Sequence, residues 1–273
     1  MILLSAISEM LSLDFMRNAF IAGFLVSIAC GIMGSYVVVN RLAGLSGGIA
    51  HASYGGIGLA CFFGFSPMFG ALGFSLACAL LMGWLTWKNR ERADTLICVI
   101  WAFGMAMGVI LTDLTPGYSG DLLSFLFGSI LTVPASLLYW MGGLTLAILI
   151  CTGIYFPQFL ALSHDPEFAR VRGIPVLRLY MLLITLITFT VVMAVQAVGL
   201  ILVIALLTIP AYIAESHAKN LRNMMCIACA VSLALTLGGT AVAYFLNLTV
   251  GPVIILLGVA LYVVNRLLTL RRR

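Results

Sequence analysis

The chain has 273 residues, of which 63% are hydrophobic and only 8% carry a charge. A water-soluble fold would lack the polar residues needed to cover its own surface, so this composition excludes a soluble protein. The formal net charge of +5 does not indicate a nucleic-acid partner, because the basic residues are spread over several loops instead of forming one patch.

Apolar stretches follow one another almost from end to end, separated by short loops. A membrane-spanning helix needs about 20 mainly apolar residues, so we expect an all-α polytopic membrane protein with a single transmembrane domain over residues 1–273. The first stretch is too long for the core of a signal peptide and should remain as a helix. We expect about nine crossings, within a range of eight to ten, at 16–39, 46–64, 68–87, 94–112, 136–156, 175–196, 198–214, 223–246 and 250–268.

The basic residues predict the orientation of these helices. If the N-terminus lies outside, thirteen of the fourteen Lys and Arg residues face the cytoplasm, and only Arg17 does not. Short cytoplasmic loops carry an excess of Lys and Arg. We therefore expect a multi-pass protein of the inner (cytoplasmic) membrane with its N-terminus outside and its C-terminus in the cytoplasm.

The region between the fourth and fifth predicted crossings does not fit a simple span. A polar outer loop contains Asp113 and Asp121, and an apolar run follows at residues 122–133. About twelve helical residues, rising about 1.5 Å each, cannot cross a hydrocarbon core of about 30 Å. We expect a short re-entrant or interfacial helix here, buried by neighbouring helices.

Small residues inside the predicted helices favour packing over chemistry. All seven cysteines fall in apolar stretches, where a thiol behaves as a small hydrophobe. Cys226 and Cys229 form a C-x-x-C pattern, for which we prefer packing over redox or zinc chemistry. Gly104 and Gly108 form a G-x-x-x-G pattern of the kind that lets two helix backbones approach closely.

The second predicted crossing is too polar and too rich in glycine to face lipid. At 3.6 residues per turn, Gly47, His51, Gly55 and Gly58 share one face. One interpretation is a translocation path lined by these residues and Tyr54, with His51 as a metal ligand. The alternative is that His51 only forms a hydrogen bond with a neighbouring helix. We prefer the path, because ionisable residues within a membrane usually serve a function.

The predicted inner loop at residues 163–175 has the pattern of a complete short helix. Asp165 can cap the free N–H groups, Pro166 fits the first helical position, and Glu167 suits the positive end of the helix dipole. Gly173 then ends the helix. This helix either binds a partner protein or lies on the membrane surface, and the pattern alone does not separate the two interpretations.

Common catalytic signatures are absent from the sequence. The only two lysines, Lys88 and Lys219, are each followed by Asn, so there is no G-x-x-x-x-G-K-[ST] loop for a nucleotide phosphate. There is also no H-E-x-x-H or G-x-S-x-G pattern. We expect a protein that is not an enzyme and binds no cofactor of its own, so an ion gradient or another subunit must supply energy.

Three segments resemble the zinc/manganese/iron ABC permease family, and the resemblance covers nearly the whole chain. Arg41 followed by His51 and Ala52 matches the family's second crossing, and residues 165–174 resemble its coupling loop. Residues 198–211 resemble its apolar motif ending in Pro-Ala, which is less specific because it is largely membrane composition. The resemblance assigns coupling to an ATPase subunit to Asp165, Pro166, Glu167, Phe168, Ala169, Arg170 and Gly173.

The resemblance implies the permease subunit of a metal-ion importer. Two permease subunits, as a homodimer of this chain, should enclose the translocation path within the lipid bilayer. Two separate ATPase subunits should dock on the coupling helices and hydrolyse ATP, and an extracytoplasmic metal-binding protein should deliver the ion. The permease itself should perform no hydrolysis.

One position departs from the family pattern. Gly47 stands where the family usually has an aspartate four residues before the histidine. Manganese prefers oxygen ligands, whereas an imidazole suits zinc. The missing carboxylate therefore favours zinc as the transported ion, with manganese or iron as alternatives.

Two other transporter classes compete with this interpretation. A siderophore or cobalamin ABC permease usually has a longer chain and more crossings. A gradient-driven secondary transporter or channel generally places several ionisable groups near the middle of the membrane. Within the predicted crossings of this chain there is little besides His51, which argues against gradient coupling.

Overall fold

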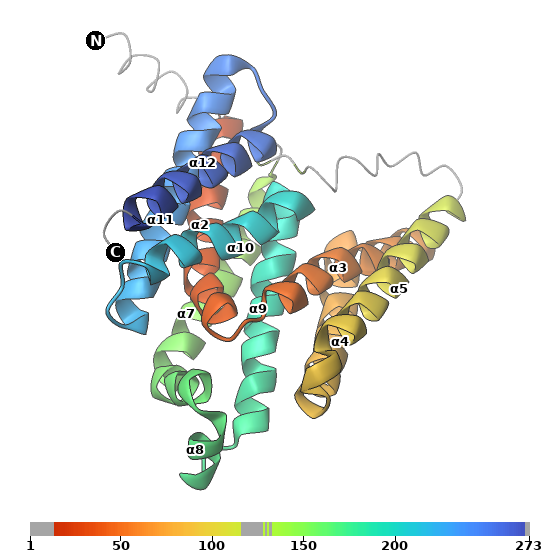
Figure 1. The fold of residues 1–273 in the computed structure, drawn as a ribbon. Coiled ribbons are helices and arrows are strands. Elements are labelled where there is room, and N and C mark those ends of the chain that lie inside the picture. The colour runs from red at the N-terminus through yellow and green to blue at the C-terminus, as the bar shows by residue number, and fades with distance from the viewer. Residues whose placement is uncertain (1–13, 116–127, 129, 131–132, 271–273) are drawn as a thin grey trace.

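The computed structural model describes residues 14–115, 128, 130 and 133–270, and this part of the chain is helical, without strands (Figure 1). A 3-10 turn (Arg90–Arg92) precedes α5, and the short helix α8 (Pro166–Val171) lies between α7 and α9. The long helices are α2 (Asp14–Val39), α3 (Ala43–Phe63), α4 (Pro67–Lys88), α5 (Ala93–Asp113), α7 (Ala135–His164), α9 (Val176–Val198), α10 (Leu200–Glu215), α11 (Leu221–Leu246) and α12 (Val250–Leu270).

These long helices occupy the predicted crossings one for one. In the described ranges, α2, α4, α5, α7, α9, α11 and α12 are each long and apolar enough to cross a membrane. Helix α10 is apolar but has only 16 residues. Helix α3 has 21 residues, but its glycines and polar side chains lower its mean hydropathy. The predicted fold class is confirmed: the chain is a multi-pass helical membrane protein.

The structure extends one predicted helix and describes only part of the predicted re-entrant segment. Helix α7 continues to His164, beyond the predicted end at residue 156, and contains Pro157 inside its 30 residues. The added turns carry the chain directly to α8. The predicted re-entrant helix at 122–133 falls largely outside the described residues, which include only Gly128, Ile130 and Val133 of that segment.

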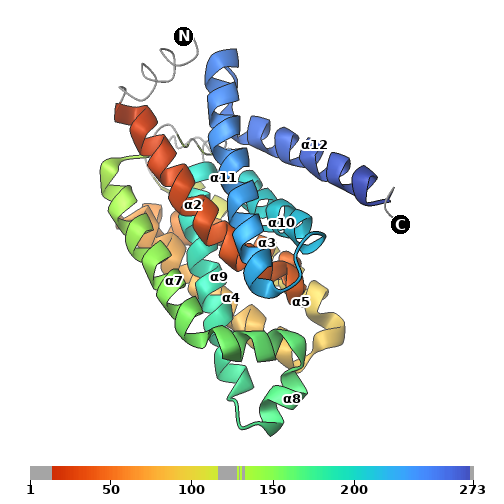
Figure 2. The same ribbon diagram turned by 90° about the vertical axis from the view of Figure 1, so that its left-hand side faces the viewer.

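Helices α2 and α9 form the centre of the bundle, and most of their residues are buried. Helix α2 packs against α11, α10, α7 and α9, while α9 also contacts α4. Helices α3, α4 and α5 pack mainly on one another and form a group at one side of the molecule (Figure 1). Helix α12 packs on α10 and α11, and its C-terminal end points away from the bundle (Figure 2).

Small and hydroxyl-bearing residues bring α2 and α11 close together. A Cβ atom on Gly31 of α2 would lie 2.5 Å from the Sγ atom of Cys229 on α11. The Ser27 hydroxyl donates a hydrogen bond of 3.1 Å to the Thr236 hydroxyl across the same interface. In a bilayer, close backbone packing and interhelical hydrogen bonds are the main forces between helices. Cys229 thus serves the packing that the sequence indicated for it.

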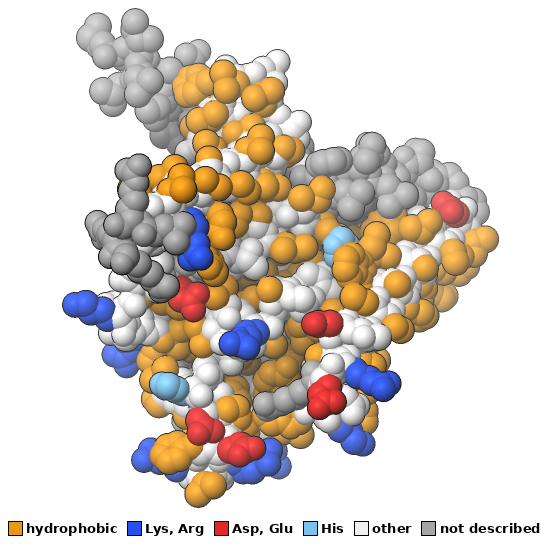
Figure 3. Space-filling model, in the orientation of Figure 1, with side chains coloured by type: hydrophobic (Ala, Val, Ile, Leu, Met, Phe, Trp, Pro, Cys, Tyr) orange, Lys and Arg blue, Asp and Glu red, His pale blue; other side chains and the backbone are white. Residues whose placement is uncertain are grey.

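The surface separates apolar from charged side chains. Hydrophobic side chains cover much of the face in Figure 3, and most of the charged side chains lie toward the end of the molecule that carries α8. Exposed apolar residues such as Val99, Phe103 and Ile154 lie on α5 and α7. A surface of this kind requires lipid or other apolar partners.

Candidate functional site

Helix α3 carries the residues predicted to line a translocation path, and it is held between α4 and α5. Its backbone approaches α5 closely because glycines face one another. A Cβ atom on Gly55 would lie 2.7 Å from the carbonyl oxygen of Gly104, and one on Gly58 would lie 2.6 Å from that of Gly108. The Gly104 and Gly108 pattern therefore performs the close packing predicted for it.

The four residues predicted to share one face do not meet one neighbour. Gly55 and Gly58 face α5, as described above. The neighbouring Tyr54 of α3 is also buried against α5, at Gly108. A Cβ atom on Gly47 would have Ile204 of α10 as its nearest neighbour, at an ordinary 3.6 Å. Gly47 therefore has room for a side chain, whereas Gly55 and Gly58 do not. A path role for these residues stays a prediction.

His51 is half-buried and stacks on Trp101 of α5, with ring centroids 4.3 Å apart and an angle of 18° between the planes. Its Nδ1 atom is buried and has no hydrogen-bond partner in the described part of the chain. The contact with the neighbouring helix is thus an aromatic stack. The simple alternative for His51, a hydrogen bond to a neighbouring helix, finds no support at Nδ1.

The candidate metal site has few ligands within one chain. Among the described residues, no three His, Cys, Asp or Glu side chains are grouped as a metal site. His51 therefore stands as a single imidazole within α3, and one imidazole binds a cation weakly unless other ligands join it. The described part of the chain therefore supplies no grouped set of ligands around His51.

Helix α8 has the local structure that its sequence predicts. The Oδ1 atom of Asp165 accepts hydrogen bonds from the backbone N–H groups of Glu167 (2.9 Å) and Phe168 (3.0 Å), and Pro166 occupies the first turn. Gly173 follows the helix with φ of +78°, a conformation that favours glycine. The predicted capped helix is confirmed, while its coupling role stays a prediction.

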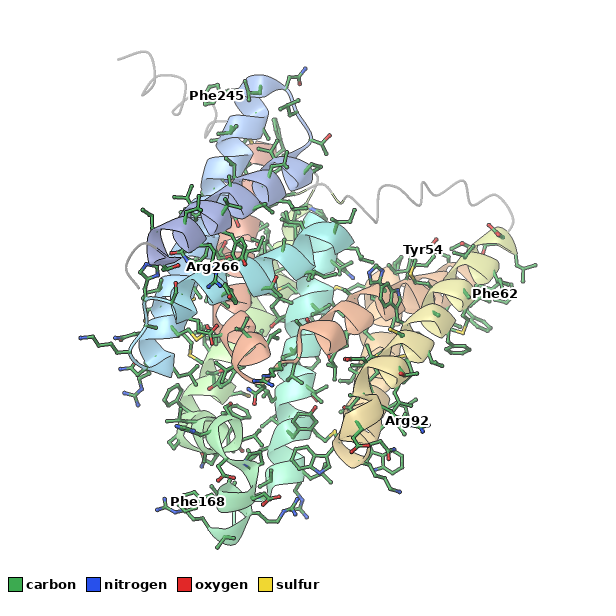
Figure 4. The ribbon with its side chains drawn as sticks, viewed as in Figure 1. Tyr54, Phe62, Arg92, Phe168, Phe245 and Arg266 are labelled. Carbon is green, nitrogen blue, oxygen red and sulfur yellow. The ribbon has the colours of Figure 1, made fainter. Side chains whose placement is uncertain are left out.

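The outer face of α8 is apolar and open. Phe168 is 54% exposed and Val171 is 87% exposed, and Phe168 lies at the tip of the molecule (Figure 4). The Arg172 guanidinium lies over the Phe168 ring, 4.8 Å from its centroid. Ala169 faces the opposite way and is fully buried in the core. This burial anchors α8 to the bundle, and the coupling role that the resemblance assigns to Ala169 stays a prediction.

A comparison with known families decides which class of transporter shares this architecture. The model of the ABC 3 transport family matches residues 12–269. This chain belongs to the ABC 3 transport family. The resemblance found in the sequence motifs is thereby confirmed.

Relatives of this ABC 3 chain match it over nearly its full length. An uncharacterized membrane protein of Synechocystis sp. is 48% identical over 96% of this chain and 94% of that protein. The manganese import system permease protein ScaB of Streptococcus gordonii is 28% identical over 95% of this chain and 93% of ScaB. The structure of PsaBC from Streptococcus pneumoniae in complex with Fab has a TM-score of 0.86 at 28% identity, covering 96% of this chain and 95% of that one.

The ABC 3 fold also brings together residues that the sequence analysis did not single out. Trp101 covers one face of the His51 ring, and Val171 is the most exposed apolar residue of α8. A cavity of about 510 Å³, lined by Arg41, Asp94 and Ser163 among others, lies at the N-terminal end of α3. Of these features, only Val171 could have been found from the local sequence, because it lies at the end of the predicted capped helix.

Proposed function

We propose that this chain is the membrane-spanning permease subunit of an ABC importer that moves a divalent metal ion into the cytoplasm. The observation that carries the proposal is the match to the ABC 3 transport family over residues 12–269. Similarity to ScaB, a manganese import permease, over 95% of the chain supports a metal ion as the cargo.

The exposed face of α8 supports a separate ATPase as the energy source. Phe168 and Val171 form a small apolar surface at the end of the molecule, and such a surface is stabilised when a partner covers it. Helix α8 connects directly to α7 and α9, which pass through the bundle. Closure of an ATPase pair on α8 would bias the bundle between two arrangements.

The remaining partners follow from the same proposal. A second copy of this chain completes the path and adds ligands near His51, and an extracytoplasmic protein delivers the metal. The N-terminus lies outside, and the α8 end faces the cytoplasm, because the basic loops lie on that side. The chain resides in the inner membrane.

Two observations bear on the choice of metal. The ScaB similarity supports manganese, whereas an imidazole at position 51 without a carboxylate at position 47 supports zinc. We place manganese first, because the similarity covers the whole chain while the zinc argument depends on one substitution. The side chain at position 47 should then tune the preference.

Uptake measured in cells that lack their own manganese and zinc importers tests the proposal. The chain is expressed with a cognate ATPase and binding protein, and radiolabelled Mn²⁺ and Zn²⁺ are supplied. Uptake should require an ATPase that hydrolyses ATP, and His51→Gln should reduce it without reducing the amount of assembled complex. Uptake that continues with a hydrolysis-deficient ATPase would contradict the proposal and favour a gradient-driven transporter.

The Gly47→Asp variant tests the ligand chemistry of the site. The nearest atom to a new Cβ at this position is the Cδ1 atom of Ile204, 3.6 Å away, so the Cβ of an aspartate makes only an ordinary van der Waals contact. A carboxylate near His51 should raise the preference for Mn²⁺ over Zn²⁺, measured by competition between the two ions during uptake. An unchanged preference at equal expression would show that Gly47 does not face the path.

A further inference from the structure

The aromatic stack between α3 and α5 fixes the position of the His51 ring. The glycine contacts bring the two helices close together, and Tyr54 lies at the same interface one turn along α3 (Figure 4). Within this interface the His51 and Trp101 rings are nearly parallel, at 18°, with their centroids 4.3 Å apart. Stacking at this distance covers one face of the imidazole and restricts its rotation.

The two ring nitrogens of His51 have different surroundings. Nδ1 is buried and has no hydrogen-bond partner within the described residues, while the side chain as a whole is only half-buried. The accessible edge of the ring is therefore the one that carries Nε2. A histidine that binds a metal usually donates its other N–H group to a carboxylate, a carbonyl or water, which fixes the ring. Here the stack restricts the ring, while Nδ1 has no hydrogen-bond partner among the described residues.

Trp101 is itself held in place on α5. Its Nε1–H group donates a hydrogen bond of 3.0 Å to the Sδ atom of Met105, one turn along the same helix. Residues four apart on a helix are neighbours, so this contact fixes the indole without help from another helix. Met105, Trp101 and His51 thus form a continuous clamp, which we name the aromatic clamp.

We propose that Trp101 is a positioning residue that holds the His51 imidazole with Nε2 directed at the passing divalent cation. This inference depends on the proposed metal transport and deepens it. Because no carboxylate or carbonyl of the described residues hydrogen-bonds to Nδ1, these residues add no basicity to the imidazole as a ligand. The clamp therefore gives a geometrically defined but weak site, which suits a cation that must be released again.

The binding test uses the purified full-length protein in detergent and Co²⁺ as the probe. Co²⁺ accepts imidazole ligands and, being paramagnetic, quenches the fluorescence of an indole in close contact. Titration with Co²⁺ should quench a fraction of the fluorescence, and added Zn²⁺ should restore it. His51→Gln and Trp101→Phe should each abolish this fraction. Trp140→Phe is the matched control and should leave it unchanged, because Trp140 belongs to α7 and its ring packs on Phe69 of α4 and not on His51.

Uptake kinetics test the positioning role. Trp101→Phe keeps an aromatic ring over His51 and should leave the KM for Mn²⁺ nearly unchanged. Trp101→Leu removes the stack and should raise KM about two- to tenfold, the range expected for loss of one aromatic pair. A Trp101→Leu variant that assembles and takes up Mn²⁺ with an unchanged KM would overturn the proposal.

The two measurements separate this inference from the proposed function. If the quenching depends on His51 but the protein supports no uptake, the transport proposal is contradicted, while the inference about the aromatic clamp stands. If uptake is normal but His51→Gln does not change the quenching, the inference about the aromatic clamp is contradicted, while the transport proposal stands. If Trp101→Leu does not fold, Met105→Leu provides a second test, because it removes the acceptor of the indole N–H group and should also raise the KM for Mn²⁺. An unchanged KM in that variant would overturn the positioning role.

Discussion

At the residue scale, glycines determine how closely the helices pack. Gly31 lies against both the backbone and the thiol of Cys229, and Gly55 and Gly58 lie against the carbonyl groups of α5. Each contact removes the space that a methyl group would need. The packing of α2 on α11 and of α3 on α5 therefore requires glycine, which has only a hydrogen atom in place of a side chain, at these positions.

Gly31→Ala should destabilise the protein by about 1–3 kcal/mol, because the new Cβ would lie 2.6 Å from the Cα and N atoms of Cys229 and the helices must separate. Thermal unfolding of the detergent-purified protein measures the effect. Gly153→Ala is the matched control: position 153 in α7 has nothing within 4 Å of a new Cβ, and alanine there should be neutral or stabilise by up to about 1 kcal/mol. Equal stability of the two variants would show that the α2–α11 contact is looser than described.

At the scale of one element, α8 has two faces with different roles. Its cap, its first-turn proline and the glycine that follows set where the helix begins and ends. Ala169 then fixes it to the core, while Phe168 and Val171 stay exposed. A substitution at Ala169 should affect the folding of the permease itself. A substitution at Phe168 or Val171 should affect only the binding of the partner.

Phe168→Lys should therefore reduce co-purification of the ATPase and metal uptake at least tenfold, because a central apolar contact in an interface is worth more than about 1.4 kcal/mol. The amount and stability of the permease should not change. Ala169→Lys should instead lower the amount of folded permease, since it buries a charge in the core. Phe62→Lys, at a partly exposed phenylalanine far from α8 (Figure 4), controls for added charge. Undiminished ATPase binding by the Phe168 variant would leave α8 as a surface helix.

At the scale of the whole molecule, the position of the charges relates the bundle to the membrane. The N-terminal end of α2 and the C-terminal end of α3 point away from α8, whereas the loops before α5, around α8 and before α11 carry clusters of basic residues. Cytoplasmic loops retain such residues. The orientation of every helix follows once one loop is assigned.

Alkaline phosphatase inserted after Phe65 should be active, because this reporter folds only outside the cytoplasm, and the same insertion after Ala218 should be inactive. A green fluorescent protein at the two positions should give the opposite pattern. The α3–α4 connection carries no basic residue, while Lys219 and Arg222 follow the second site. A reversed pattern at both sites would invert the proposed topology and place α8 on the wrong side for an ATPase.

Sequence by itself determined the features that depend on neighbours along the chain. The nine long helices of the described ranges were predictable because a bilayer demands long apolar segments. Helix α8 was predictable because caps, prolines and glycines act within a few residues. Family membership was also predictable, since the motifs at residues 41–52 and 165–174 occur in order.

Tertiary structure alone decided which face of each helix meets which neighbour. Helical periodicity grouped Gly47 with Gly55 and Gly58, yet the first faces α10 and the other two face α5, since neighbouring helices change along the length of α3. The stack of His51 on Trp101 joins residues 50 positions apart, and the burial of Ala169 depends on the ends of α7 and α9. Such contacts arise from long-range packing, which no local pattern of residue types specifies.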